Sequence, residues 1–445
     1  MTAVGIDAIE IWSGNLKLDL PETFASVKGE DPDKYRKGLG LEASSFPDVY
    51  EDIVTMGANA SKRLMERRGL EPGDIGRIDV ATESAFDHSK PVSTYIAGCL
   101  EQVFEGDFRH ANKGERKFAC VSGTQTIDDA YNWIRAGRNR DRAALVVATD
   151  TALYERGDPG EATQGAGAVA MLIDENPDVL ALSDEQGFGS MDETDFLKPN
   201  QQFPSVDGKR SVQVYLSRMR EALEDYESVA GRVYEEDFVY APFHTPFPGM
   251  VRKAGLLAYR HITRDTETED QLAEEIGRQP REDEYDSREE YEEAIREYMD
   301  ALKGTERYRS WYADVIEPTL TISSQVGNWY TASVHIARAS ALMAAADADR
   351  DFEGEHLLIA SYGSGAQAEI HAETVQSGWK EEVEALDIDT QLENRYDLTF
   401  DEYEQVHNVH DFDKDVEVDA FTQPEGEFAF TGWGRMNERK YEYVE

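Results

Sequence analysis

Short runs of apolar residues recur along the chain, and each ends in small or polar residues. Such continuous runs are typical of strands covered on both faces, because alternation is expected where one face meets water. The runs lie at residues 77–84, 142–150, 165–173, 237–244 and 356–365. Two of the intervening stretches, residues 52–70 and 211–226, are predicted to be helices. The pattern therefore predicts a layered α/β fold.

Two later stretches depart from this pattern. Residues 264–303 are mostly acids, Arg, Gln and Tyr, with few large aliphatic residues. We expect an exposed helical excursion there, because charge pairs one turn apart support a helix while a core needs apolar residues. The alternation in the final "GEFAFTGWGRMNERKYEYVE" predicts a β-hairpin.

Charge narrows the possible partners. The chain has 90 acidic against 45 basic residues, a formal net charge of -45. So acidic a protein repels nucleic acid and anionic membranes, and its surface is typical of adaptation to high salt. The two cysteines make neither a disulfide framework nor a zinc site. With no secretion signal and no apolar run of ~20 residues, we expect a cytoplasmic protein.

Cys120 stands out because a helix is predicted to begin just after it. Apolar residues at 127, 130, 131 and 134 have helical spacing, so Cys120 falls at the helix N-terminus. There the macrodipole and unpaired N–H groups favour an anion, and we expect a lowered thiol pKa and a nucleophile. Cys99 belongs to an apolar stripe and is interpreted as a structural residue.

Other candidates lie where predicted strands end. Glu83 could be a buried general base whose pKa is raised by desolvation, and His244 precedes a helix that Pro248 could open. Asn328 begins another helix, and the turn at 362–365 could present backbone N–H groups to an oxyanion. His407 and His410 are expected at the surface, and no cluster argues for a metal.

Taken in order, five segments resemble the 3-hydroxy-3-methylglutaryl-CoA synthase family, which has the thiolase fold. They are "ESAFDHSKPV", "FACVSGTQTIDDAYNWI", "FHTPFPGMVRKA", "GNWYTASV" and "SYGSG". The resemblance extends from the opening strand to about Glu373. It implies that Glu83, Cys120 and His244 are catalytic. It also implies that Asn328 and Ser364 contact substrate.

The resemblance implies two related α/β halves in layers αβαβα. Residues 1–175 would hold Cys120, and residues 176–445 would hold His244, Asn328 and the acidic excursion 264–303. It implies a homodimer that joins acetyl-CoA to acetoacetyl-CoA in the mevalonate pathway, with no metal or redox cofactor.

Softer matches concern the CoA substrates and the surroundings of the catalytic centre. Candidate substrate contacts are Asp31, Lys34, Asp158, Thr163, Ser211 and Lys253. Candidate supporting acids are Asp87, Asp150 and Asp195. Because the global charge opposes anionic CoA, a local basic rim is expected from Lys34, Lys209, Arg210, Arg252 and Lys253. Gly249 stands where the family commonly has a lysine, so one CoA contact is in doubt.

Two other functions fit parts of the pattern. A decarboxylating ketoacyl synthase of the same fold would use Cys, His and Asn without a carboxylate base, and Glu83 argues against it. A non-catalytic scaffold that passes CoA intermediates between enzymes would not need Cys120, Glu83 and His244 intact.

Overall fold

The computed structural model describes residues 2–348, 350–409 and 418–445. Its main sheet has eight strands in the order β11-β12-β8-β1-β7-β6-β4-β5. Strands β8 and β12 are long antiparallel neighbours, whereas β1 meets β8 only at the pairs Gly5–Ala181 and Ile6–Leu180. The sheet therefore consists of two groups of strands with a narrow junction. The strands are β1 (Val4–Ser13), β4 (Ile75–Ala81), β5 (Asn112–Arg116), β6 (Ala143–Ala152), β7 (Gly165–Glu175), β8 (Leu180–Ser190), β11 (His356–Gly363) and β12 (Gln367–Val375).

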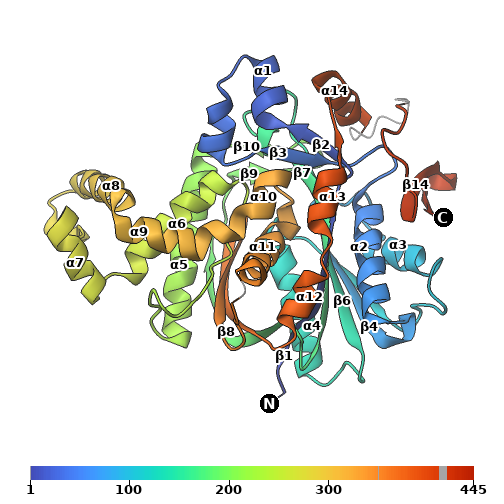
Figure 1. Ribbon diagram of the computed structural model, residues 1–445, viewed down its shortest axis with the longest axis horizontal. Coiled ribbons are helices and arrows are strands. Elements are labelled where there is room, and N and C mark those ends of the chain that lie inside the picture. The colour runs from blue at the N-terminus through green and yellow to red at the C-terminus, as the bar shows by residue number, and fades with distance from the viewer. Residues whose placement is uncertain (1, 349, 410–417) are drawn as a thin grey trace.

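Two helices, α4 and α11, lie between the two groups of strands (Figure 1). Helix α11 is buried around most of its circumference, which explains why its sequence is apolar on nearly every side. Helices α2 and α3 cover the outer face of the first group, and α5 and α6 cover the second. The predicted αβαβα layers are therefore confirmed. The helices are α2 (Ile53–Arg68), α3 (Val92–Leu100), α4 (Ser122–Arg135), α5 (Gly208–Ala230), α6 (Pro248–Ile262) and α11 (Ser333–Asp347).

The expectation of a strand at residues 237–244 is wrong. This segment makes two isolated parallel bridges to β11, from Tyr240 to Leu357 and from Phe243 to Ala360. Pro242 lies between the two bridges and has no N–H to donate, so a continuous ladder cannot form. The segment still runs beside β11 and delivers His244 to the end of that strand, where the His244 N–H donates to the Ala360 carbonyl over 2.7 Å.

The acidic segment forms an arm that projects at the left of Figure 1. Its two main helices are α7 (Glu267–Ile276) and α8 (Arg288–Gly304). Leu272, Tyr298 and Leu302 are its buried residues on these helices, and they pack onto the cluster under α6. A few apolar side chains thus attach an otherwise solvated arm. The C-terminal hairpin is present as predicted, between β14 (Glu427–Trp433) and β15 (Arg439–Val444).

Smaller elements complete the fold. They are β2 (Leu16–Asp19), α1 (Ala25–Lys28), β3 (Ala43–Phe46), β9 (Phe196–Leu197), β10 (Ser205–Val206), α9 (Glu306–Trp311), α10 (Thr321–Val326), α12 (Trp379–Glu384), α13 (Ile388–Asn394), β13 (Tyr396–Asp397) and α14 (Phe400–Val409). In the described part of the chain, every helix is too short or too polar to cross a bilayer.

Helix α14 corrects another expectation. His407 is buried, with 1% of its surface exposed, and its ring stacks on Phe203 with centroids 5.7 Å apart. Its Nε2 lies 2.9 Å from the Tyr154 carbonyl, which provides a hydrogen-bond partner for the buried ring. A histidine among acids in the sequence is thus covered by segments distant in the chain. His410 lies outside the described residues.

Candidate active site

Cys120 sits in a tight turn between β5 and α4. Ala119 just before it has φ +45°, a left-handed conformation that residues with a side chain adopt at a cost. The turn closes with a hydrogen bond from the Ser122 N–H to the Ala119 carbonyl. The end of β11 lies against it: a Cβ on Gly363 would lie 2.7 Å from the Phe118 carbonyl oxygen. Glycine at 363 therefore lets the two turns approach closely.

Glu83 contacts the nucleophile candidate directly. The Cys120 Sγ donates to Glu83 Oε1 over 2.8 Å, although 37 positions separate the residues. Burial, and then the charge of Asp150, raise the pKa of Glu83 to about 7, as expected for a general base. Strand β4 ends at Ala81, so Glu83 follows a strand end as predicted.

The expected low thiol pKa is wrong. Burial, followed by the neighbouring Glu83 carboxylate, raises the pKa of Cys120 well above its usual value. The predicted position of Cys120 at the N-terminus of α4 is confirmed, since the helix begins at Ser122. A partial positive charge at a helix end is small beside the cost of an anion in a buried site that already holds a carboxylate. In the free protein the proton therefore stays on sulfur, which donates a hydrogen bond to Glu83.

Asp150 ties three segments together beneath this pair. Its carboxylate is fully buried and accepts five hydrogen bonds. Oδ1 accepts from Thr82 Oγ1, the Glu83 N–H and Ser84 Oγ, and Oδ2 accepts from the N–H and Oγ1 of Thr331. The Glu83 turn is thus fixed to the segment that begins α11.

Aromatic residues that the sequence analysis missed surround the sulfur. Cys120 packs in one cluster with Ala152 and Tyr330, and Phe196 lies against it. The Phe196 and Tyr330 rings meet edge to face, with centroids 6.2 Å apart. Burial raises the pKa of Tyr154 and Tyr330, so both phenols stay neutral beside Cys120. Tyr330 could have been recognised as a site residue from the sequence, because it stands within the "GNWY" motif.

His244 is buried and uncharged. Burial lowers its pKa to about 3, and Nδ1 has no hydrogen-bond partner among the described residues. Its ring centroid lies 6.1 Å from that of Tyr362, whose phenol interacts electrostatically with Cys120. Tyr362 also donates to Asp195 over 3.5 Å. His244 and Tyr362, from the segments 237–244 and 356–365, are therefore brought to the same site.

Asn328 lies on another side of the site around Cys120. Its N–H donates to the Thr163 carbonyl over 3.0 Å, and its Oδ1 accepts from the Tyr330 N–H over 2.9 Å. Tyr330 itself has φ +43°, so the Asn328 carboxamide supports a strained turn next to the sulfur. The amide nitrogen is the remaining polar end of this side chain.

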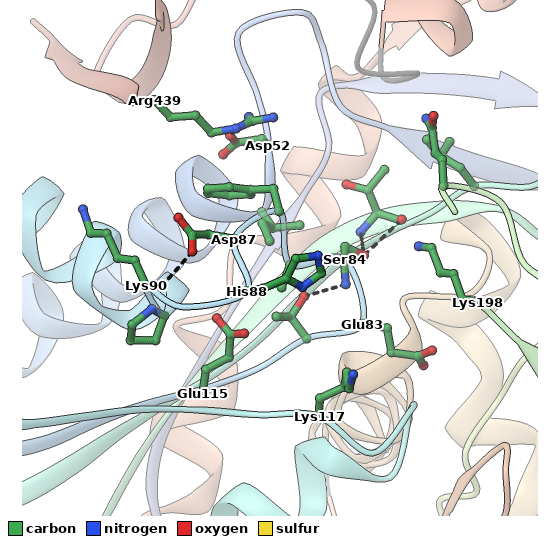
Figure 2. A pocket seen from close by; sticks show the side chains of 18 of the residues that line it. Asp52, Glu83, Ser84, Asp87, His88, Lys90, Glu115, Lys117, Lys198 and Arg439 are labelled. Carbon is green, nitrogen blue, oxygen red and sulfur yellow. Dashed lines mark hydrogen bonds and ion pairs between the residues drawn. The ribbon is translucent and has the colours of Figure 1, made fainter. Parts of the chain in front are cut away.

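A cleft of about 2000 Å³ opens onto Glu83. Figure 2 shows Glu83 and Lys198 at one end of it and Lys90 and Arg439 at the other. Asp87 and Ser364 also line it. The Asp87 carboxylate accepts the N–H groups of Lys90 and Ser89, and these bonds lower its pKa. Asp87 therefore shapes the loop at this cleft.

The segments that carry the CoA-contact candidates contribute residues to one apolar cluster, which includes Tyr35, Leu153, Ala162, Phe203 and Phe247. Each of Lys34, Asp158, Thr163, Ser211 and Lys253 stands within eight positions of one of these residues in the sequence. Four distant segments therefore meet at one apolar cluster, and one of its residues, Leu153, also lines the cleft that opens onto Glu83.

Several charges at that place already have partners. Lys34 pairs with Glu30 over 2.7 Å, Arg210 pairs with Glu193 over 2.7 Å, and Asp31 accepts the Asp33 N–H. The basic rim is thus partly neutralised by the chain's own acids. In helix α5, the Ser211 N–H donates to the Asp207 carbonyl.

Close packing against residues 38–39 explains why position 249 is a glycine. A Cβ there would lie 2.5 Å from the Gly38 carbonyl oxygen, so a longer side chain would push α6 away from residues 38–39. Arg252, one turn later, instead donates to the Lys37 carbonyl over 2.8 Å. Across the described ranges, no three His, Cys, Asp or Glu side chains converge as a metal site would require.

A cysteine presented by a strained turn, a carboxyl group in contact with it and αβαβα layers define a thiolase-fold acyltransferase. Family models named hydroxymethylglutaryl-coenzyme A synthase N terminal and C terminal match residues 1–178 and 188–430. The chain belongs to the hydroxymethylglutaryl-CoA synthase family, and its activity is that of this enzyme class.

Individual relatives agree. The chain is 76% identical to the hydroxymethylglutaryl-CoA synthase of Haloferax volcanii over all of both chains. It is 31% identical to the human cytoplasmic hydroxymethylglutaryl-CoA synthase over 83% of this chain and 71% of that protein. A structure of MvaS in complex with 3-hydroxy-3-methylglutaryl coenzyme A superposes with TM-score 0.84, at 28% identity over both full chains. A structure of the synthase complexed with CoA gives 0.77, at 28% identity over 99% of this chain and all of that one.

Proposed function

We propose that the protein joins acetyl-CoA, acetoacetyl-CoA and water into 3-hydroxy-3-methylglutaryl-CoA and CoA through an acetyl-Cys120 intermediate. The observation that carries the proposal is the 2.8 Å contact between Cys120 Sγ and Glu83 Oε1. It puts a proton acceptor with a pKa of about 7 beside the atom that would hold the acetyl group.

In the first half-reaction Cys120 gives its proton to Glu83, and the thiolate attacks the carbonyl carbon of acetyl-CoA. The C–S bond to CoA breaks, and the CoA thiolate takes the proton back from Glu83, which leaves Glu83 as a carboxylate. Backbone N–H groups of Cys120 and of the turn at Ser364 would stabilise the oxyanion, and the close approach of Gly363 to the Phe118 carbonyl supports this assignment. The high thiol pKa is consistent with a nucleophile that forms when substrate arrives.

In the second half-reaction the Glu83 carboxylate removes a methyl proton from the acetyl group. The resulting carbanion attacks the ketone carbon of acetoacetyl-CoA, and protonated Glu83 returns the proton to the new alkoxide. Water then cleaves the thioester to Cys120. The neutral His244 ring and the Asn328 amide nitrogen would donate to acetoacetyl-CoA, while Asp150 and Asp195 hold the surrounding turns.

The CoA moieties would lie beside the apolar cluster that includes Tyr35 and Phe247. Asp31, Lys34, Asp158, Thr163, Ser211 and Lys253 are proposed as substrate contacts, with Lys209, Arg210 and Arg252 completing the basic rim. Support comes from the apolar cluster around Tyr35 and Phe247, which joins their segments. Asp87 is proposed to act from the loop of the cleft.

We also propose a homodimer, because among the described residues β5 pairs with β4 alone, and its other edge has no neighbouring strand in the main sheet. The division into halves 1–175 and 176–445 is proposed from the narrow junction between β1 and β8. A cytoplasmic location is proposed because both cysteines are free thiols, and Cys120 must remain one to be acylated.

Two variants test the chemistry. Cys120→Ala should form no acetyl-enzyme with acetyl-CoA. Glu83→Ala should still acetylate Cys120, because losing the neighbouring negative charge lowers the thiol pKa, yet it should not condense. Mass spectrometry of the protein and quantitation of the acyl-CoA product separate the steps.

Three results would count against the proposal. An adduct on another residue would refute Cys120 as the nucleophile, and normal condensation by Glu83→Ala would refute the base. Condensation that depends on a malonyl thioester and on release of CO₂ would favour the ketoacyl synthase. If the purified chain converts neither substrate, the scaffold gains support.

A further inference from the structure

The C-terminal hairpin forms one wall of the cleft that opens onto Glu83. Phe430, Trp433 and Arg439 line this wall. Successive side chains of a strand face opposite sides, and along β15 they alternate between partly buried and exposed. Arg439 is partly buried, whereas its neighbour Lys440 is exposed. The hairpin therefore brings an arginine from near the C-terminus to the cleft.

Aromatic rings surround the Arg439 guanidinium group. Its Cζ lies 4.3 Å from the ring centroid of Phe86, 4.8 Å from that of Trp433 and 5.1 Å from that of Phe430. A guanidinium group within ~6 Å of a ring centroid is attracted to the face of the ring. Its Nη1 also pairs with the carboxylate of Asp52, the N-cap of α2, over 2.6 Å. The arginine thus joins the hairpin both to Phe86 and to the start of α2.

Phe86 belongs to the same loop as Glu83. The chain passes from β4 to α3 in an irregular loop, so side-chain contacts must hold the shape of that loop. Asp150 accepts the N–H of Glu83 at one end. Three positions later, the Phe86 ring meets Tyr95 edge to face with centroids 5.4 Å apart, and Arg439 lies over it. The contacts of Phe86 therefore bear on the position of Glu83.

We propose that Arg439 is a positioning residue for Glu83: its guanidinium group holds the Phe86 ring, and with it the loop that carries the base. Figure 2 shows Arg439 and Glu83 at opposite ends of the cleft, so the arginine acts through the loop rather than by direct contact. The inference rests on the proposed function, in which Glu83 removes the methyl proton. That step requires the carboxylate within reach of the proton, whereas acetylation of Cys120 is expected to proceed even in Glu83→Ala.

The test compares the two half-reactions in single turnovers. Arg439→Met keeps an unbranched side chain and removes the charge and the planar group. We expect condensation from the acetyl-enzyme to slow by ~10-fold, because a misplacement of about 1 Å can cost ~10²-fold and Asp150 still anchors one end of the loop. Acetylation of Cys120 should change by at most about 2-fold, because it does not require the base in place. Lys440→Met removes the same charge from the exposed neighbour and should leave both rates unchanged.

A double-mutant cycle shows whether the arginine acts through the ring. Phe86→Leu removes the ring and should slow condensation to a similar degree, and the double variant should be no slower than either single variant. Additive effects, or equal slowing of both half-reactions in Arg439→Met, would overturn the proposal. If Arg439→Met does not fold, Phe86→Leu still tests the loop, because equal slowing of both half-reactions there would also overturn it.

Glu83→Ala distinguishes this proposal from the proposed function. If Glu83→Ala condenses at the normal rate, the proposed function fails, whatever Arg439 does. If Glu83→Ala cannot condense and Arg439→Met condenses at the wild-type rate, the Arg439 proposal alone is overturned.

Discussion

Asp150→Asn should damage the site by removing one acceptor atom. The carboxylate accepts three hydrogen bonds at Oδ1 and two at Oδ2. Asparagine has one acceptor oxygen, so one set of donors must face an amide nitrogen that cannot accept. The orientation that keeps the Glu83 turn leaves both Thr331 donors facing that nitrogen.

The expected decrease in the free energy of unfolding follows from these contacts. Thr331 Oγ1 can still donate to the Ala81 carbonyl over 3.1 Å. The Thr331 backbone N–H is therefore the donor that is left without an acceptor. An unsatisfied buried donor costs ~1–3 kcal/mol, and a hydrogen bond to a charged acceptor is worth ~1.5–3 kcal/mol. We expect Asp150→Asn to lower the free energy of unfolding by about 3 kcal/mol. Asp150→Ala, which also strands the Glu83 N–H, should lower it by about 5 kcal/mol.

Urea unfolding in molar KCl, followed by tryptophan fluorescence, measures the loss. The exposed Asp300→Asn in α8 is the control for charge, expected to change stability by at most ~0.5 kcal/mol. Condensation should fall more than Cys120 acetylation, because Asp150 anchors the Glu83 turn. The lost charge by itself would lower the Glu83 pKa and favour the ionised base. Wild-type stability and condensation in Asp150→Asn would refute this account of the hydrogen bonds.

Two further predictions concern packing and salt. Gly363→Ala should slow Cys120 acetylation by ~10²-fold, because its Cβ would displace the nucleophile turn. Gly98→Ala, in an open part of α3, should leave the single-turnover rate unchanged, and equal rates in both variants would contradict the close-approach argument. Stability and activity should rise together from dilute to molar KCl, because screening shortens repulsion among the surplus acids from ~30 Å at 0.01 M to ~3 Å at 1 M. A flat or falling melting temperature over that range would contradict salt adaptation.

Much of this protein could be predicted from its sequence. Apolar runs located the strands β4, β6, β7 and β11, since the apolar residues of a segment indicate that the segment is buried. Helical spacing after Cys120 placed the start of α4 correctly. The order of motifs identified the family, and the position of Glu83 at a strand end predicted a raised pKa. These are local properties, read over a few residues.

Tertiary structure alone decided the rest, because it depends on groups far apart in the chain. The thiol pKa of Cys120 is raised by burial and by Glu83, 37 residues away, so the helix end did not predict it. His407 is buried by segments that its acidic neighbourhood does not reveal. The Asp150 carboxylate accepts a hydrogen bond from Thr331 across 181 positions, a pairing that neither segment reveals alone. Sequence sets what each segment can bury, whereas proton affinity and contact are set by which segments meet.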